Sequence, residues 1–188
     1  MIYCILGISG SGKTTIAKKI EKTMNIPLLV SYTSRPIRPG EVEGVDYIYV
    51  DNKYFDDHFD EFIDIREYTV FDGSIWKYGY KDDGINAKNN DYLLVIDAIG
   101  FEYFKQYFCP DYLRAIVVNS PISQLYDRAE NRGDNIEEIK RRINDDMIKI
   151  ENFKKQENHL NVYNYFELDF VLIQVKKIIE RGGNACGE

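Results

Sequence analysis

The sequence predicts an α/β fold in which a parallel sheet is covered by helices on both faces. Apolar runs of strand length alternate with segments whose apolar residues recur at helical spacing. A glycine-rich turn separates the first such strand from the first helix. The alternation is interrupted once, at about residues 32–88, by a segment rich in turn formers and strand formers, which predicts an inserted small α+β lobe.

The core elements follow one another along the chain. The first strand is the apolar run 2–6, which stops at Gly7, and the first helix follows at about 13–24. We expect a second strand at 27–31. The later core elements are predicted as strands at 92–96, 113–118 and 159–163, and as helices at about 100–108, from Ser120-Pro121 onward, and 166–181.

The inserted lobe is predicted from turn signals. Asp72-Gly73 indicates a hairpin that runs to Tyr80. The other lobe elements are predicted as strands at 47–50 and 62–69, with a short helix at 54–59 capped by Asp51 or Asn52.

Length and charge bound the possible functions. The chain has 188 residues, which predicts one domain, and its 24 Lys and Arg against 31 Asp and Glu give a net charge of −7. This balance counts against a general nucleic-acid surface, which needs a basic face. Three cysteines at no metal-like spacing indicate a reducing compartment, the cytoplasm. With no signal peptide and no apolar stretch of about 18 residues, we expect no membrane association.

The glycine-rich turn fits the phosphate-loop pattern G-x-x-x-x-G-K-[ST] from Gly7 to Thr14 without a mismatch. Its glycines let backbone N–H groups surround phosphate oxygens at a helix N-terminus, Lys13 reaches the β- and γ-phosphates, and the Thr14 hydroxyl ligates Mg²⁺. We therefore expect a nucleoside triphosphate here. The residues expected to bind it are Gly7, Ser9, Gly10, Ser11, Gly12, Lys13, Thr14 and Thr15.

A second cationic segment begins the inserted lobe. Arg35 and Arg38 lie three residues apart in a loop stiffened by proline, and they could fork onto one dianionic phosphate, with hydroxyls of Ser31, Tyr47 and Tyr78 completing the cage. On charge spacing alone, a solvated basic loop is an equal alternative.

This segment resembles the guanylate kinase signature S-x-T-T-R-x-x-R-x-G-E-x-x-G-x-x-Y. The match has Ser34 in place of the second threonine and otherwise holds at Ser31, Thr33, Arg35, Arg38, Gly40, Glu41, Gly44 and Tyr47. The resemblance spans about residues 1–180. It implies a three-part kinase: a core of 1–31 and 89–188, a monophosphate-binding lobe at about 32–88, and a helical lid at about 127–146.

The resemblance also implies roles for individual residues. Ser31, Arg35, Arg38, Tyr47 and Tyr78 fall where the family holds the acceptor phosphate, with Glu41 bracing the arginines. Glu67 and Asp97 fall on the carboxylates that read guanine, a base whose N1–H and N2–H₂ groups are donors. Asn164 falls in the adenine pocket.

Two positions depart from the family. Tyr80 stands where the family has Ser or Thr, and Val95 replaces the first acid of Asp-x-Asp. Asp97 could therefore serve the Mg²⁺ shell, the base, or both, and the base pocket could be reshaped.

The lid segment 125–133 resembles the family's L-x-x-R-L-x-x-R-G, and Arg142 matches a later lid arginine. Arginines carried by a closing lid stabilise the charge of the migrating phosphoryl group. The expected catalytic residues are Lys13, Arg128, Arg132 and Arg142. No general base is needed, because the attacking phosphate oxygen is already ionised.

The implied reaction is Mg²⁺-dependent transfer from ATP to GMP or dGMP by a monomer or homodimer, with small nucleotides as its only partners. Two alternatives stay open. One is a related kinase with another acceptor, such as a different deoxynucleotide or a ribose bisphosphate. The other is a non-catalytic binding module, which typically loses the phosphate-loop residues that Lys13 and Thr14 represent here.

Overall fold

The core sheet of the protein is parallel. The computed structural model describes residues 1–70, 72–131, 135–165 and 167–182. Within them the core strands lie in the order β6-β1-β7-β8, every neighbouring pair parallel. These strands are β1 (Ile2–Gly7), β6 (Tyr92–Val95), β7 (Leu113–Asn119) and β8 (His159–Tyr163). The predicted α/β class is thus confirmed.

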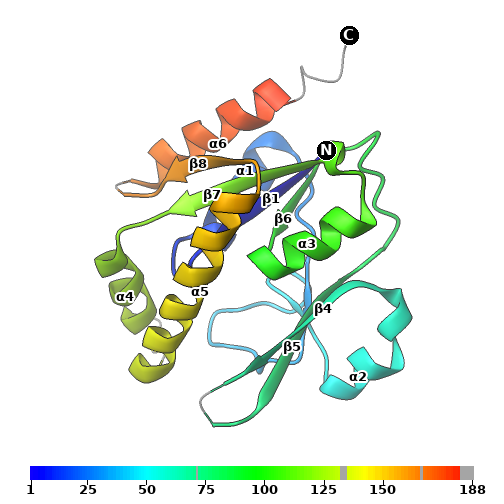
Figure 1. Ribbon diagram of the computed structural model, residues 1–188, viewed down its shortest axis with the longest axis vertical. Helices are drawn as coiled ribbons and strands as arrows, with labels where there is room; N and C mark the ends of the chain where they lie inside the picture. The colour runs from blue at the N-terminus through cyan, green and yellow to red at the C-terminus, as the bar shows by residue number, and fades with distance from the viewer. Residues whose placement is uncertain (71, 132–134, 166, 183–188) are drawn as a thin grey trace.

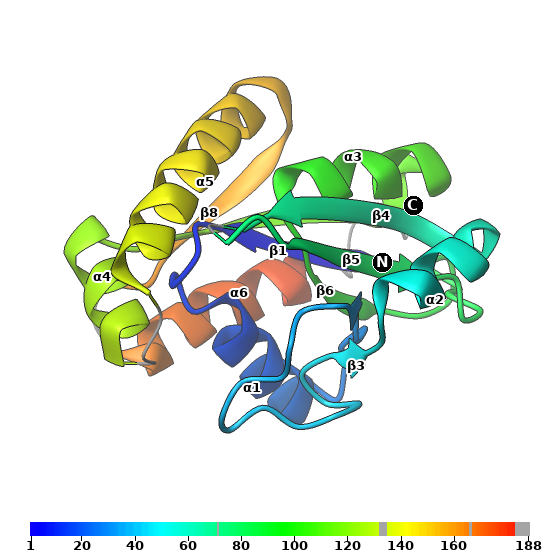
Figure 2. The same cartoon turned by 90° about the horizontal axis from the view of Figure 1, so that it is seen from below.

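Helices cover both faces of this sheet. Figure 2 shows α3 and α5 above the sheet and α1 and α6 below it, while α4 lies beside the far end of α5 (Figure 1). The helices are α1 (Lys13–Met24), α3 (Ala98–Tyr107), α4 (Ile122–Asn131), α5 (Ile136–Gln156) and α6 (Leu168–Gly182).

The central strand explains the two-sided core. All six residues of β1 are buried, and their side chains alternate between the faces. Tyr3 and Ile5 pack with residues of α1 and α6, whereas Cys4 and Leu6 pack with residues of α3 and α5. A strand apolar at every position is what a parallel sheet between two helical layers requires.

The inserted lobe carries a second sheet of order β3-β2-β5-β4. Asp51, not Asn52, caps its helix by accepting a 2.8 Å hydrogen bond from the Tyr54 N–H. The lobe elements are β2 (Tyr32–Thr33), β3 (Ile48–Tyr49), α2 (Asn52–Asp57), β4 (Phe62–Thr69) and β5 (Ile75–Lys81).

The second core strand predicted at 27–31 is wrong. This stretch makes one isolated bridge, from Leu28 to Leu93, and the chain then turns into the lobe. There the next two residues, Tyr32 and Thr33, pair antiparallel with β5. Pro27 and Leu29 hydrogen-bond to Leu93 of β6 at this bridge, but the pairing does not continue to Ser31, whose carbonyl accepts from Ile48 of the lobe sheet.

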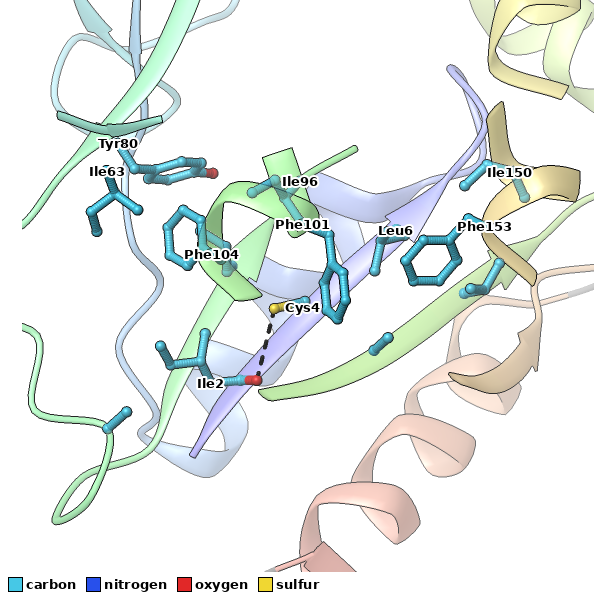
Figure 3. Close-up of a cluster of buried hydrophobic side chains, with 14 residues drawn as sticks. Ile2, Cys4, Leu6, Ile63, Tyr80, Ile96, Phe101, Phe104, Ile150 and Phe153 are labelled. Atoms are coloured by element: carbon cyan, nitrogen blue, oxygen red, sulfur yellow. Dashed lines mark hydrogen bonds between the residues drawn. The ribbon is translucent and has the colours of Figure 1, made fainter. Parts of the chain in front are cut away.

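The lobe is fastened to the core by packing. Ile63 of β4 and Tyr80 of β5 belong to the same buried cluster as Phe104 of α3 and Leu6 of β1 (Figure 3). The rings of Tyr80 and Phe104 meet edge to face with centroids 5.7 Å apart. The base of the lobe is thus continuous with the core.

Among the described helices, none is both long and apolar enough to cross a membrane.

Two isoleucines of α6 provide a matched test of the core. Ile179 is 4% exposed and Ile173 is 50% exposed. We expect Ile179→Ala to lower the free energy of unfolding by about 2–5 kcal/mol, because it removes buried methyl groups and leaves a cavity. Ile173→Ala should change it by no more than about 0.5 kcal/mol. Urea denaturation measures both, and equal losses would contradict the assigned faces of α6.

Candidate active site

The phosphate loop joins β1 to α1 and has the backbone of an anion cradle. Gly10 and Gly12 have positive φ angles, 84° and 94°, which L-residues with a side chain rarely adopt. Lys13 begins α1, and its ammonium donates back to the carbonyls of Gly7 at 2.7 Å and Ile8 at 3.0 Å. The first N–H groups of a helix lack intrahelical acceptors, so the loop presents donors and positive charge together.

A buried hydroxyl in this loop supports the same interpretation. Ser11 is 1% exposed, and among the described residues its Oγ has no hydrogen-bond partner. A buried polar atom without a partner is costly, and a phosphate oxygen would satisfy it. At the same turn Ser9 and Thr14 are partly exposed and Thr15 is exposed.

Two predicted residues from distant elements close around the loop. Asn164, just after β8, donates to the Ser11 carbonyl at 2.8 Å. Arg128 of α4 donates to the Gly10 carbonyl at 3.2 Å. The structure therefore brings both onto the phosphate loop.

Helix α5 also contacts the phosphate loop, through a residue that the sequence analysis does not single out. Asp146 accepts hydrogen bonds from the Ser9 backbone N–H and hydroxyl, both at 2.7 Å. The Asp146 carboxylate thus takes up two hydrogen-bond donors of the phosphate loop. Arg132 lies outside the described residues.

The loop that carries Arg35 and Arg38 is built around a buried ion pair. Arg35 is 3% exposed, and its Nη2 donates to both Glu41 carboxylate oxygens at 2.7 and 2.9 Å. Glu41 also accepts from the Arg38 N–H at 2.8 Å and from the Tyr49 hydroxyl at 2.6 Å. Glu41 therefore holds the loop that carries both arginines, as its place in the signature suggested.

Two tyrosine rings pack in succession between this ion pair and strand β5 of the lobe. The Arg35 guanidinium lies 5.2 Å from the centre of the Tyr47 ring, and the rings of Tyr47 and Tyr78 are 5.9 Å apart. Burial raises the pKa of Tyr47, while the positive charges of Arg35 and Arg142 oppose the rise.

Ser31, Tyr47 and Tyr80 line one cleft with Thr14 of the phosphate loop. Tyr80 is 3% exposed and donates through its hydroxyl to the Val95 carbonyl at 2.7 Å. The cleft therefore runs from the phosphate loop to the two positions that depart from the family.

The structure does not bring Glu67 and Asp97 together. Alternate side chains of β4 point to opposite faces of its sheet. Glu67 is 56% exposed and pairs with Lys77 at 3.3 Å on the outer face. The inner face carries Asp64, Arg66 and Tyr68, and the last two contact Asp97.

The sequence analysis does not predict Asp64 and Arg66 as site residues, because it assigns their segment only to a strand. The signal was present: in Ile63-Asp64-Ile65-Arg66, charged residues occupy every second position of a strand next to a buried core. Asp146 had no comparable signal, because its contact depends on how α5 crosses the loop.

Comparison with known proteins agrees with these features. A family model described as an AAA domain matches residues 4–156. The guanylate kinase of Legionella pneumophila (strain Lens) is 32% identical over 176 residues, covering 92% of this chain and 77% of that protein. The chain belongs to the guanylate kinase family. A second guanylate kinase, from Zymomonas mobilis, is 32% identical over 187 residues, covering 95% and 82% of the two chains.

The fold of a solved guanylate kinase, that of Anaplasma phagocytophilum, matches with a TM-score of 0.72 at 22% identity, over 98% of this chain and 87% of that one. The solved structure confirms the fold, and the curated relatives confirm the resemblance noted from the signature and the kinase class of the enzyme.

The ion pair of Glu41 makes stability depend on pH. Burial alone would raise the pKa of Glu41, but hydrogen bonds from Arg35 and Tyr49 hold it below its usual value. The stabilisation is therefore complete above the unfolded pKa and is lost as pH falls through the lowered folded value. We expect Glu41→Gln to cost about 1–3 kcal/mol at pH 7, with a smaller deficit at acid pH.

Urea denaturation at pH 7 and at about pH 3 measures this change. Glu130→Gln, an exposed change on α4, is the control and should alter neither value. A Glu41→Gln deficit that is the same at both pH values would contradict the lowered pKa.

Proposed function

We propose that the protein transfers the γ-phosphoryl group of ATP to GMP or dGMP, in a Mg²⁺-dependent reaction that gives ADP and GDP or dGDP. The observation that carries this proposal is the shared cleft, because Thr14 of the phosphate loop lines it together with Ser31, where the core passes into the lobe, and with Tyr47 of the acceptor lobe. A donor and an acceptor phosphate held in one cleft can react in line. The guanylate kinase relatives support guanine as the acceptor base.

The chain's own residues divide the work between the two phosphates. Lys13 and the N-terminus of α1 hold the donor, with Asn164 closing the loop, while Arg35, Arg38 and Tyr47 hold the acceptor. Arg128, Arg142 and Arg132 bring positive charge to the migrating group when the lid closes. The acceptor oxygen is already ionised, so no residue removes a proton.

Mg²⁺ would be held by the Thr14 hydroxyl together with oxygens of the triphosphate, whose charge it offsets. Asp97 does not suit a metal ligand. Its Oδ1 accepts from the Gly100 N–H at 2.8 Å, and its Oδ2 accepts from Arg66 and Tyr68. The sequence led us to expect two protein ligands of Mg²⁺, Thr14 and Asp97, and we propose only Thr14.

The proposed parts are a core of residues 1–31 and 89–188, an acceptor lobe of about 32–88 and a lid of about 127–146. The reaction takes place in the cytoplasm, in a monomer or a homodimer. The buried Tyr80 favours one rival, a kinase of the same architecture with a different acceptor, since a phenol fills far more space than a serine hydroxyl.

An acceptor panel decides between these functions. We expect GMP and dGMP to release ADP from ATP faster than AMP, CMP, dTMP or a ribose bisphosphate in a coupled assay. If both guanine nucleotides are poor and another acceptor is good, the rival kinase replaces the proposal. If no acceptor reacts, the chain is a binding module.

A lysine pair on α1 tests the donor site. We expect Lys13→Ala to lower kcat by at least about a hundredfold, because it removes the cation at the transferred phosphate. Lys19→Ala, an exposed change in the same helix, should leave kcat unchanged. Full activity in Lys13→Ala with intact circular dichroism would contradict the donor site.

A further inference from the structure

Next to Tyr80, which lines the cleft, lies a buried group of charges that the proposed reaction does not use. The Arg66 cluster consists of Asp64, Arg66 and Tyr68 on the inner face of β4, Tyr80 on β5, and Asp97 at the start of α3. Arg66 is 8% exposed, and its ion pairs measure 2.5 Å to Asp64 and 3.2 Å to Asp97. One cation thus lies between two carboxylates.

The cluster lies beyond the acceptor-phosphate site, where the rest of a nucleotide would extend. The Tyr47 ring beside Arg35 contacts Tyr78, and the Tyr78 ring in turn lies 5.5 Å from that of Tyr68. Tyr68 donates to Asp97. A row of rings therefore leads from the phosphate-binding arginine to the cluster, and Tyr80, which lines the cleft, packs its ring 5.9 Å from the Arg66 guanidinium.

The two carboxylates have little capacity left for a ligand. Asp97 accepts from Gly100 through Oδ1, and from Arg66 and Tyr68 through Oδ2. Asp64 accepts from the Tyr80 N–H at 2.9 Å through Oδ1, while Oδ2 faces the Arg66 Nε. Burial would raise the pKa of Asp97, yet the charge of Arg66 and the hydrogen bonds hold it below its usual value, so this acid stays ionised and fixes the guanidinium.

The guanidinium, in contrast, keeps donors to offer. Its buried Nε is taken up by the ion pair with Asp64 Oδ2, 2.5 Å away, and its Nη1 donates to Asp97. Among the described residues, its Nη2 makes no such contact. The Arg66 Cζ also packs closely on α3, where a Cβ at Gly100 would lie only 3.1 Å away. The cluster thus presents a fixed, incompletely satisfied donor.

We propose that Arg66 reads the acceptor base through a carbonyl oxygen of that base, and that Asp64 and Asp97 position Arg66 instead of contacting the base. This inference rests on the proposed function and names its acceptor class: 6-oxopurine nucleoside monophosphates, with or without a 2-amino group. A guanidinium has donors and no acceptor, so it suits O6 of GMP or IMP and opposes the 6-amino group of AMP.

The comparison of GMP with IMP separates the two ways of reading guanine. IMP keeps O6 and N1–H and lacks only the 2-amino group. If carboxylates read the base, IMP leaves a buried acceptor unpaired and reacts poorly. If Arg66 reads O6, the 2-amino group contributes little.

The experiment measures kcat/KM of the wild-type protein for GMP, IMP and AMP in the ADP-release assay. We expect GMP and IMP to agree within about threefold and AMP to be at least about a hundredfold lower. A preference for GMP over IMP of tenfold or more overturns the inference and leaves the proposed function intact. No turnover with GMP and IMP alike overturns the proposed function, and the inference with it.

Variants at the cluster test the residue itself. Arg66→Met keeps the apolar stem and removes every donor, so we expect kcat/KM for GMP and IMP to fall at least about tenfold. The GMP to IMP ratio should rise, because the released carboxylates can then accept from the 2-amino group. Arg141→Met is the matched control, since Arg141 pairs with Glu138 and Asp145 on the surface of α5.

Arg66→Met leaves the buried carboxylates of Asp64 and Asp97 without their cation, so this variant could fail to fold. The double variant Asp64→Asn with Arg66→Met leaves a single carboxylate and should show the same loss for GMP and IMP. ATP binding and circular dichroism confirm folding of each variant. If either folded variant keeps wild-type values for GMP, IMP and AMP, the role of Arg66 is overturned.

Discussion

The inserted lobe depends on one constraint: positive charge that is removed from water must be paired. Arg35 and Arg66 are both buried, and each is held by carboxylates, Arg35 by Glu41 and Arg66 by Asp64 and Asp97. An unpaired guanidinium at either place would be strongly destabilising. Pairing also fixes the direction of the remaining N–H groups, so the same interactions that stabilise the lobe orient it for binding.

Packing gives these charges a rigid base. Tyr80 and Ile63 place the lobe sheet in the same apolar cluster as Leu6 and Phe104 of the core. In consequence the Arg66 cluster lies where β4, β5 and α3 meet, between lobe and core. Helix α5 contacts the phosphate loop, where Asp146 accepts a hydrogen bond from the Ser9 N–H.

Local patterns predicted much of the fold and part of the site. The phosphate loop and the Arg35–Glu41 loop could be predicted because their chemistry lies within a few consecutive residues. The hairpin at Asp72-Gly73 was likewise predicted from its turn. The strand at 27–31 was not, because a short apolar run also suits a connection, and here the pairing with β6 is limited to the contacts of Pro27 and Leu29 with Leu93.

The residues of the Arg66 cluster could not be predicted in the same way. Choosing Glu67 over Asp64 and Arg66 depends on which face of β4 is turned inward, and pairing with β5 shifts register between Phe62 and Asp64. A shift of one residue exchanges the inner and outer side chains. The contact of Arg66 with Asp97 joins residues 31 apart in sequence, which no local pattern specifies.

A crystal structure with GMP bound would test the account most directly. The account predicts the phosphate on Arg35 and Arg38, and an Arg66 nitrogen within about 3.2 Å of the guanine O6. Asp64 and Asp97 should keep their contacts with Arg66. Guanine N1 and N2 hydrogen-bonded to those carboxylates, with Arg66 displaced from the cleft, would contradict it.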